Sequence, residues 1–291
     1  LGGLLNVTFG NAAELIIGIS ALKAGLIVLV KASIIGSIIG NILLVMGAAM
    51  FAGGLKYSSQ KFNRTAVLSS GTTLFLAVIA LVMLEIFLAT APGIDAVTVE
   101  HLSIVVAVLM IAIYGASLLF SLHTHRHLYV GEVAEYEGDW STKKSVIVLF
   151  LATAAVAWMS EILIGAVEPI VHTLGWTEMF IGVIVVAIIG NAAEHSSAIL
   201  VAIKNRMDLS IQIALGSATQ IAMLVAPLLV LLSFFFDTHI TLVFGMFELV
   251  TIVLSVLIAN LVIQDGESNW LEGLQLLAAY IIIGVAFFFH P

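Results

Sequence analysis

The sequence of 291 residues contains no cysteine and few charged residues. Without cysteine, disulfides, thiol catalysis and cysteine metal sites are excluded. Charged residues make up only 10% of the chain, against about 25% in globular domains, so a soluble protein is not expected. The net charge of −8 comes without a basic patch, which argues against a nucleic-acid partner. Apolar residues make up 62% of the chain, enough for about nine bilayer crossings of about 20 residues each.

Long apolar runs broken by polar clusters predict an all-α polytopic membrane protein. Strand-like alternation is absent, and the runs are too long for the strands of a membrane barrel. Several runs exceed the minimum length for a crossing, so tilted or kinked helices are expected. The predicted spans cover residues 1–22, 26–53, 66–91, 99–122, 145–167, 178–203, 209–236, 240–263 and 271–289.

The basic residues predict how these spans are oriented. Of the 10 Lys and Arg residues, only Lys23 and Lys31 lie near the loops of one side, and the others lie in loops of the opposite side. Cytoplasmic loops are enriched in Lys and Arg. The loops around 54–65, 123–144, 204–208 and 264–270 are therefore expected in the cytoplasm.

A short motif is repeated along the chain. Gly-Asn-Ala-Ala-Glu occurs at 10–14 and again at 190–194, and Gly36-Ser37 recurs as Gly216-Ser217 at the same spacing of 180 residues. Two matches at one spacing indicate duplicated helix pairs. Five predicted crossings separate the copies, and because five is odd, the copies run in opposite directions. The sequence therefore predicts an inverted-repeat transporter bundle with a substrate site near the membrane midplane.

The repeat divides the chain into three parts. Residues 1–122 form the first half, residues 123–144 an acidic cytoplasmic linker, and residues 145–291 the second, inverted half. The linker could gather divalent cations or could be a solvated hinge between the halves. A predicted span precedes the second motif but none precedes the first. The first half is therefore expected to lack its leading helix or helices.

The two motifs predict a cation site. Asn11 and Glu14 are three residues apart, as are Asn191 and Glu194, so each pair presents its oxygens on one helix face. If the inverted copies meet, two carboxylates and two amide carbonyls converge. Hard divalent cations, Ca²⁺ above all, take six to eight oxygen ligands. We therefore predict that Asn11, Glu14, Asn191 and Glu194 bind cations and protons, and that Glu14 and Glu194 are the metal ligands.

The same two glutamates predict a proton counter-ion. Without a cation, burial and mutual repulsion disfavour two bare carboxylates, so they would take up protons. Ca²⁺ and protons then compete for the same oxygens, which is how an exchanger works. The alternative is that both glutamates are neutral and only join helices, but a glutamate duplicated beside a duplicated asparagine favours function. Ca²⁺ is expected as transported substrate, and no cofactor is expected.

Four further residues are candidates for an accessory cation path. Ser37 and Ser217 follow the motifs on the next helix of each pair, and Gln220 lies one turn after Ser217. The two serines could supply hydroxyl ligands or serve close helix packing equally well. Glu161 lies within the predicted span 145–167 and could line the path.

These motifs resemble those of the calcium/proton exchangers of the calcium/cation antiporter superfamily. The resemblance rests on both GNAAE motifs, on the stretch from Gly216 to Val230 and on the stretch from Asn260 to Gly273. It implies two five-helix halves preceded by an extra first helix. It also implies that Glu14 and Glu194 are the paired cation ligands and proton carriers.

The resemblance carries over to the remaining candidates as well. It implies that Asn11 and Asn191 lie beside the carboxylates, that Ser217 and Gln220 form a polar strip, and that Glu161 occupies the acidic position before the second motif. It further implies a multi-pass protein of the plasma membrane in a prokaryote, or of a vacuolar or similar acidic-compartment membrane in a eukaryote.

The sequence leaves other functions open. A sodium-coupled calcium/cation antiporter is the nearest alternative, and a non-transporting membrane scaffold is another. An intramembrane hydrolase would need paired catalytic aspartates, a His-Glu-x-x-His motif or a Ser–His dyad, and only the neighbours His195 and Ser196 suggest one. We therefore expect a secondary transporter and no enzyme, with Ca²⁺, protons and the lipid bilayer as its partners.

Overall fold

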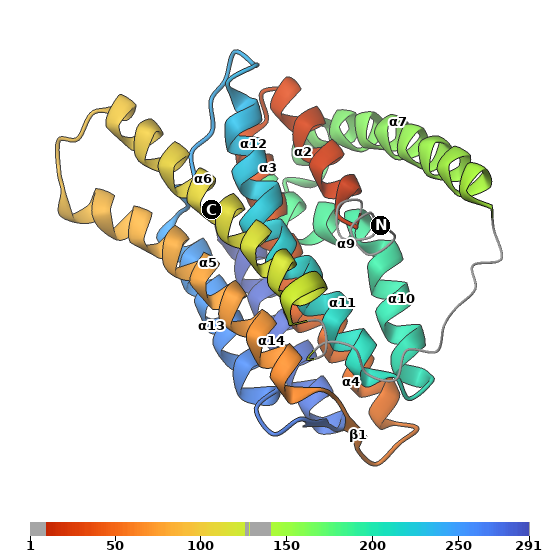
Figure 1. Cartoon of the computed structure of the whole chain (residues 1–291). Coiled ribbons are helices and arrows are strands. Elements are labelled where there is room, and N and C mark those ends of the chain that lie inside the picture. Colours follow the sequence, from red (N-terminus) through yellow and green to blue (C-terminus); the bar gives the residue numbers. More distant parts are fainter. Residues whose placement is uncertain (1–9, 126–127, 129–140, 291) are drawn as a thin grey trace.

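The structure is a computed structural model that describes residues 10–125, 128 and 141–290. Helices dominate these residues (Figure 1). Before the linker they are α2 (Ala12–Lys23), α3 (Ile27–Ile39), η1 (Gly40–Val45), α4 (Met46–Gly54), α5 (Arg64–Thr90), α6 (Ala96–Leu119) and η2 (Phe120–Thr124), with the short strand β1 (Gln60–Lys61). The acidic residues predicted for the linker lie outside the described residues.

The second half of the chain has a similar order of helices. It contains α7 (Thr142–Leu174), α8 (Glu178–Phe180), η4 (Ile181–Val186), α9 (Ala187–Gly190), α10 (Ala192–Ile203), α11 (Met207–Gln220), η5 (Ile221–Val225), α12 (Ala226–Ser233), α13 (Met246–Val262) and α14 (Trp270–Phe289), with strand β2 (Glu267–Ser268). The segments labelled η are π-helical turns, which are rare and are frequently found at functional sites.

Polar side chains define where several helices begin. Asn63 accepts a hydrogen bond from the Ala66 backbone N–H ahead of α5, and Asn269 caps α14. Asp95 accepts from the Thr98 backbone N–H at 2.8 Å ahead of α6. These side chains satisfy amide groups that have no partner within the helix. The bonds from Thr98 also hold the pKa of the exposed Asp95 carboxyl below its usual range.

The helices agree with the predicted membrane character. Among the described residues, six helices are long and apolar enough to cross a membrane, or seven if Glu178–Gly190 and Ala192–Ile203, bent by 59°, form one span. The predicted span 240–263 contains a shorter apolar helix, Met246–Val262. The predicted span 1–22 begins in residues that the structure does not describe. The all-α membrane architecture is supported, and the count of nine stays a prediction.

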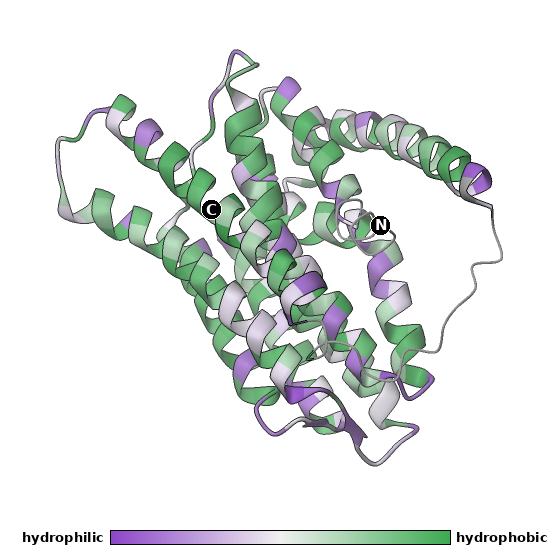
Figure 2. Cartoon of the chain, viewed as in Figure 1, coloured by the Kyte–Doolittle hydropathy of each residue, from purple (hydrophilic) through white to green (hydrophobic). Residues whose placement is uncertain are grey.

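Two long helical segments form the centre of the bundle. Ile27–Gly54 runs through α3, η1 and α4, and Met207–Ser233 runs through α11, η5 and α12. In an apolar stretch of 18 residues within each segment, 83% and 72% of the residues, respectively, are buried. The other spans surround them with apolar surfaces, and hydrophilic residues gather mainly in the loops (Figure 2). In the corresponding stretch of α7, only 11% of the residues are buried. This helix packs against α2 at the periphery of the bundle (Figure 1).

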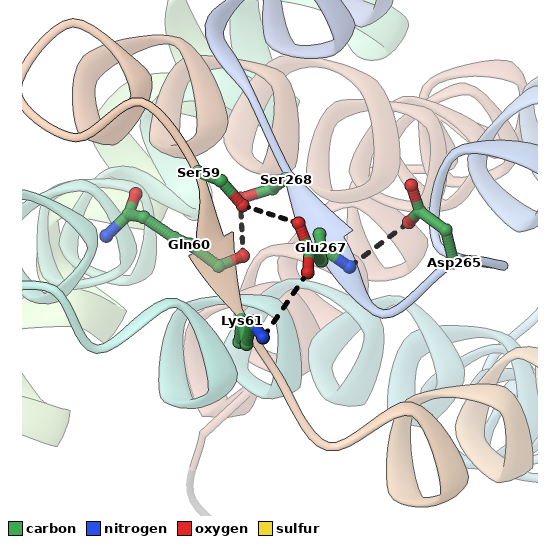
Figure 3. A network of polar contacts seen from close by, with 6 residues as sticks. All are labelled: Ser59, Gln60, Lys61, Asp265, Glu267 and Ser268. Carbon is green, nitrogen blue, oxygen red and sulfur yellow. Dashed lines mark hydrogen bonds and ion pairs between the residues drawn. The ribbon is translucent and has the colours of Figure 1, made fainter.

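A two-stranded antiparallel ribbon joins two loops at one end of the bundle. Gln60 pairs with Ser268, and Lys61 pairs with Glu267. The Ser59 hydroxyl donates to the Glu267 carboxylate at 2.8 Å, and Lys61 Nζ lies 3.6 Å from the same group (Figure 3). Exposed ion pairs contribute little to stability, so the contact between the two loops depends mainly on the backbone pairing. The ribbon connects the loop after α4 to the loop before α14.

Glycines allow α4 and α14 to pack with their backbones in contact. A methyl group added at Gly273 would lie 2.6 Å from the Gly47 carbonyl oxygen and 2.8 Å from Phe51 Cα. Distances this short cannot be relieved by a side-chain rotation, because the neighbouring atoms belong to backbone. Helix packing in membranes relies on such small residues.

The substitution Gly273→Ala tests this packing. It should lower stability by about 1–3 kcal/mol, because α4 and α14 must move apart. The midpoint of thermal unfolding in detergent, followed by intrinsic tryptophan fluorescence, measures the effect. Gly165→Ala is the matched control, since nothing lies within 4 Å of the added methyl on α7. An equal midpoint for both variants would contradict the assigned contact.

Candidate functional site

Both GNAAE motifs lie at the start of a helix. Asn11 precedes α2, and Asn191 stands at the break between α9 and α10. The helix is interrupted directly after Gly190, because Asn191 leaves helical geometry with φ −93° and ψ 8°. Glu14 and Glu194 occupy the first turns of α2 and α10, where the positive end of the helix dipole favours a carboxylate.

Reciprocal hydrogen bonds join the two copies of the repeat. Asn191 Nδ2 donates to Ser37 Oγ at 2.9 Å, and Ser217 Oγ donates to Asn11 Oδ1 at 2.8 Å. Each motif asparagine thus bonds to the serine of the other copy. All four side chains are buried. The structure therefore brings together four of the residues that the sequence singled out.

A fifth residue of this cluster, Asn41, was missed by the sequence prediction. Asn41 is fully buried in η1, and its Nδ2 donates to Asn191 Oδ1 at 3.1 Å and to Ser217 Oγ at 3.0 Å. The repeat did not reveal it, because the position 180 residues later is the apolar Ile221. The signal that could have revealed Asn41 is a single amide side chain among the apolar residues of the predicted span 26–53.

The two glutamates lie beside this cluster. A methyl group added at Gly190 would lie 3.8 Å from Glu14 Oε1, so Glu14 of the first copy reaches the second motif. Among the described residues, one oxygen of each carboxylate and the Asn41 carbonyl oxygen are buried without a hydrogen-bond partner. Such groups cost free energy unless a ligand satisfies them.

These oxygens suit a hard cation. Ca²⁺ prefers carboxylate and amide oxygens together with backbone carbonyls and water. Within the described part of the chain, no group of three His, Cys, Asp or Glu side chains could hold a metal ion. A cation between Glu14 and Glu194 would therefore depend on amide, hydroxyl or water oxygens as further ligands.

The two carboxylates face different cavities. Glu194, Ser217 and Gln220 line a cavity of about 880 Å³. Glu14 and Ser37 line a separate, small space of about 10 Å³, which is about the room that one water molecule needs. The large cavity extends between the start of α5, the end of α6 and the start of α11, whose loops are those predicted to be cytoplasmic.

The structure places the accessory residues in two different environments. Gln220 is buried and lines the large cavity with Ser217. Glu161, in contrast, is exposed on α7 and is not among the described residues that line either cavity. The structure does not bring Glu161 to the cluster, because it lies on the exposed surface of the peripheral helix. His195 is half-buried, and its Nε2 has no hydrogen-bond partner among the described residues.

The comparison with known families decides where the chain belongs. The family described as "Sodium/calcium exchanger protein" matches residues 1–123 and 144–289. The chain belongs to this family. The predicted resemblance to the calcium/cation antiporter superfamily is confirmed at this level.

Several proteins similar to this chain have names that describe a transport activity. The chain is 49% identical to the Ca²⁺/H⁺ antiporter ChaA of Bacillus subtilis, over 99% of the chain and 83% of that protein. It is 48% identical to the Ca²⁺/H⁺ antiporter of Aphanothece halophytica, over 100% of the chain and 82% of that protein. It is 36% identical to the vacuolar calcium ion transporter of Schizosaccharomyces pombe, over 100% of the chain and 72% of that protein.

Solved structures of other proteins share the fold. Native YfkE matches with a TM-score of 0.86 and 46% identity, over 99% of the chain and 84% of YfkE. The H⁺/Ca²⁺ exchanger CAX matches with a TM-score of 0.72 over 95% of the chain and 74% of CAX. At 18% identity, the second match shows a shared fold alone.

Replacing Asn41 tests the polar cluster. Asn41→Ala should destabilise the protein by about 1–3 kcal/mol, because Asn191 Oδ1 and Ser217 Oγ lose a buried donor. Thermal unfolding in detergent measures the effect. Thr72→Ala is the control, since its exposed hydroxyl bonds only to the Leu68 carbonyl of its own helix. Equal stability of the two variants would show that Asn41 does not hold the cluster together.

Proposed function

We propose that this protein is a secondary active transporter that exchanges cytoplasmic Ca²⁺ for external protons. Two relatives that carry the name Ca²⁺/H⁺ antiporter are 48–49% identical to nearly the whole chain, and this is the main support. The activity is transport and no enzymatic reaction. Ca²⁺ is the substrate, H⁺ is the counter-ion, and no cofactor takes part.

The proposed cation site lies between Glu14 and Glu194, with Asn11 and Asn191 beside them. The observation that carries this assignment is the pair of buried carboxylate oxygens without hydrogen-bond partners among the described residues. The carboxylates bind either Ca²⁺ or protons, because both compete for the same oxygens and two bare charges repel each other. This competition couples the two fluxes.

Asn41, Ser217 and Gln220 are proposed to complete the path around the site. Asn41 and Ser217 hold the motif asparagines, and Gln220 faces the large cavity with Glu194. Ser37 completes the set through its bond with Asn191. Glu161 was predicted for the same path, and its exposed position on α7 gives this assignment no support.

The transport mechanism is proposed to be alternating access by an inverted repeat. The halves are residues 1–122 and 145–291, joined by the cytoplasmic linker 123–144. Supporting this division, α2 and α10 begin 180 residues apart, and the π-helical turns η1 and η5 begin at nearly the same offset. Inverted repeats in transporters move against each other around a central site. Glu194 faces the cavity near the loops predicted to be cytoplasmic, which corresponds to access from that side.

The family also includes sodium/calcium exchangers by its description, so sodium coupling is the competing function. A flux measurement separates the two. The purified protein is reconstituted into proteoliposomes, and ⁴⁵Ca uptake is measured with either a proton gradient or a sodium gradient. The proton gradient alone should drive uptake. Uptake driven only by sodium would overturn proton coupling, and no uptake with either gradient would favour a non-transporting scaffold.

The variants Glu14→Gln and Glu194→Gln test the site. Each should abolish proton-driven ⁴⁵Ca uptake, because glutamine is nearly isosteric with glutamate but neither carries a charge nor exchanges protons. Asp237→Asn is the control, since Asp237 lies exposed in the loop after α12. It should transport like the unsubstituted protein. Retained transport in both glutamate variants would contradict the site assignment.

A further inference from the structure

Hydroxyl side chains are gathered on the walls of the large cavity. Among the described residues that line it, α5 contributes Ser70 and Thr73, and the segment of α6 and η2 contributes Ser117 and Ser121. None of the lining residues in the described part of the chain is Lys, Arg or His, and the one carboxylate is that of Glu194. The cavity is therefore polar on these two walls and contains no positive charge from the described residues.

Each of these four hydroxyls already uses its hydrogen within its own helical segment. The acceptors are backbone carbonyl oxygens at 2.7 to 3.3 Å, in the pairs Ser70–Ala66, Thr73–Ser69, Ser117–Tyr114 and Ser121–Leu118. A hydroxyl group has one hydrogen to donate and two lone pairs that accept. The four oxygens can therefore accept hydrogen bonds from the contents of the cavity but donate none to them.

The hydroxyls are confined to one half of the hairpin that α5 and α6 form (Figure 1). A second cavity of about 360 Å³ lies farther along the same helices. The described residues that line it fall between Leu76 and Phe87 on α5 and between Leu102 and Ile113 on α6, with Met223 of η5, and all are apolar. An ion finds no replacement for its water on such a surface. Polar contacts for an ion are thus found in the half nearer the loops predicted to be cytoplasmic.

The spaces beside the two carboxylates differ in what they can hold. Six water molecules around a cation occupy about 180 Å³, at about 30 Å³ for each water. The cavity beside Glu194 has about 880 Å³ and admits such a hydrated ion. The space beside Glu14 has about 10 Å³ and does not. A cation that moves from Glu194 to Glu14 must therefore lose most of its water after it has entered the large cavity.

We propose that Ser70, Thr73, Ser117 and Ser121 form a binding site for a hydrated divalent cation, which is held there with its water shell intact before it reaches Glu194. Water bound to a cation donates hydrogen bonds outward, and the hydroxyl oxygens accept them. Glu194 supplies the negative charge that attracts the cation into the cavity. The role of this hydroxyl site in transport rests on the proposed exchange function, whereas cation binding to it does not.

The hydroxyl site distinguishes binding of a cation from its transport. Mg²⁺ gives up its water reluctantly, whereas Ca²⁺ accepts flexible shells of protein oxygens. Mg²⁺ therefore occupies the hydroxyl site but does not move on between the carboxylates. It acts as an inhibitor from the side of the large cavity.

Hexaamminecobalt(III) is a suitable probe, because its ammonia ligands donate hydrogen bonds as bound water does and stay on the metal. Isothermal titration calorimetry of the purified protein in detergent measures its affinity. The double variant Ser70→Ala/Thr73→Ala should bind the probe at least about fivefold more weakly, because two water-like contacts are lost. The double variant Ser117→Ala/Ser121→Ala should show the same loss from the opposite wall.

The matched control is the double variant Thr72→Ala/Thr90→Ala on the same helix α5. Both hydroxyls are exposed and bond to carbonyls of their own helix, and neither residue lines the cavity. This variant should bind the probe like the unsubstituted protein. The midpoints of thermal unfolding should agree among all three double variants. If Ser70→Ala/Thr73→Ala does not fold, the pair on the α6 wall decides the result.

Inhibition by Mg²⁺ is the second measurement. In inside-out vesicles, whose cytoplasmic side faces the medium, added Mg²⁺ should compete with Ca²⁺ for proton-driven ⁴⁵Ca uptake. The Ser70→Ala/Thr73→Ala variant should need at least about fivefold more Mg²⁺ for half-inhibition, because the hydrated ion loses the same contacts. The Thr72→Ala/Thr90→Ala control should be inhibited like the unsubstituted protein.

The two measurements separate the hydroxyl site from the transport function. Weaker binding of hexaamminecobalt(III) by the cavity variants, with no ⁴⁵Ca flux in any variant, would support the site although the proposed exchange fails. Equal affinity of the cavity variants and the control would overturn the site, even where exchange is normal. Absence of probe binding by the unsubstituted protein would overturn it as well.

Discussion

The burial of polar side chains within an apolar bundle is the constraint on which the rest of this structure depends. Inside a membrane protein, an amide or hydroxyl finds no water and must bond to another part of the chain. Asn11 and Asn191 meet this need by bonding to the serine of the opposite copy. These bonds hold the starts of α2 and α10 against α11 and α3. The carboxylates of the first helical turns are then placed near one cluster, each lining a different cavity.

Close backbone packing supplies the complementary constraint. In a bilayer, apolar contacts between helices give little advantage over contacts with lipid, so glycine-mediated approach and polar bonds decide which helices associate. Gly47 and Gly273 join α4 to α14, and Gly36 joins α3 to η4. Gly47 and Gly273 are both buried, and Gly36 directly precedes Ser37 of the polar cluster. The same kind of packing therefore acts both in the frame of the bundle and next to the polar cluster.

The repeated pattern guided the choice of candidate site residues, and a residue outside the repeat was overlooked. Glu14 and Glu194 could be selected because each appears in a duplicated motif, and Ser37 and Ser217 because they share its spacing. Asn41 has no polar counterpart and escaped notice. Glu161 was placed near the cation path from its depth in a span and from the family resemblance, and the structure leaves it exposed on α7. Depth does not determine which face of a helix meets the bundle.

Sequence alone was enough for the membrane class, the apolar helices, the duplicated motif and the resemblance to an antiporter superfamily. The first three follow from composition and spacing, which act locally along the chain, and the resemblance rests on the motifs themselves. Only the tertiary structure decided that the copies bond through Asn–Ser pairs, that Asn41 joins them, and that one carboxylate faces a large cavity while the other is enclosed. The reason is that these features depend on distances between helices far apart in the chain. Two copies of one motif can have different surroundings although their residues are the same.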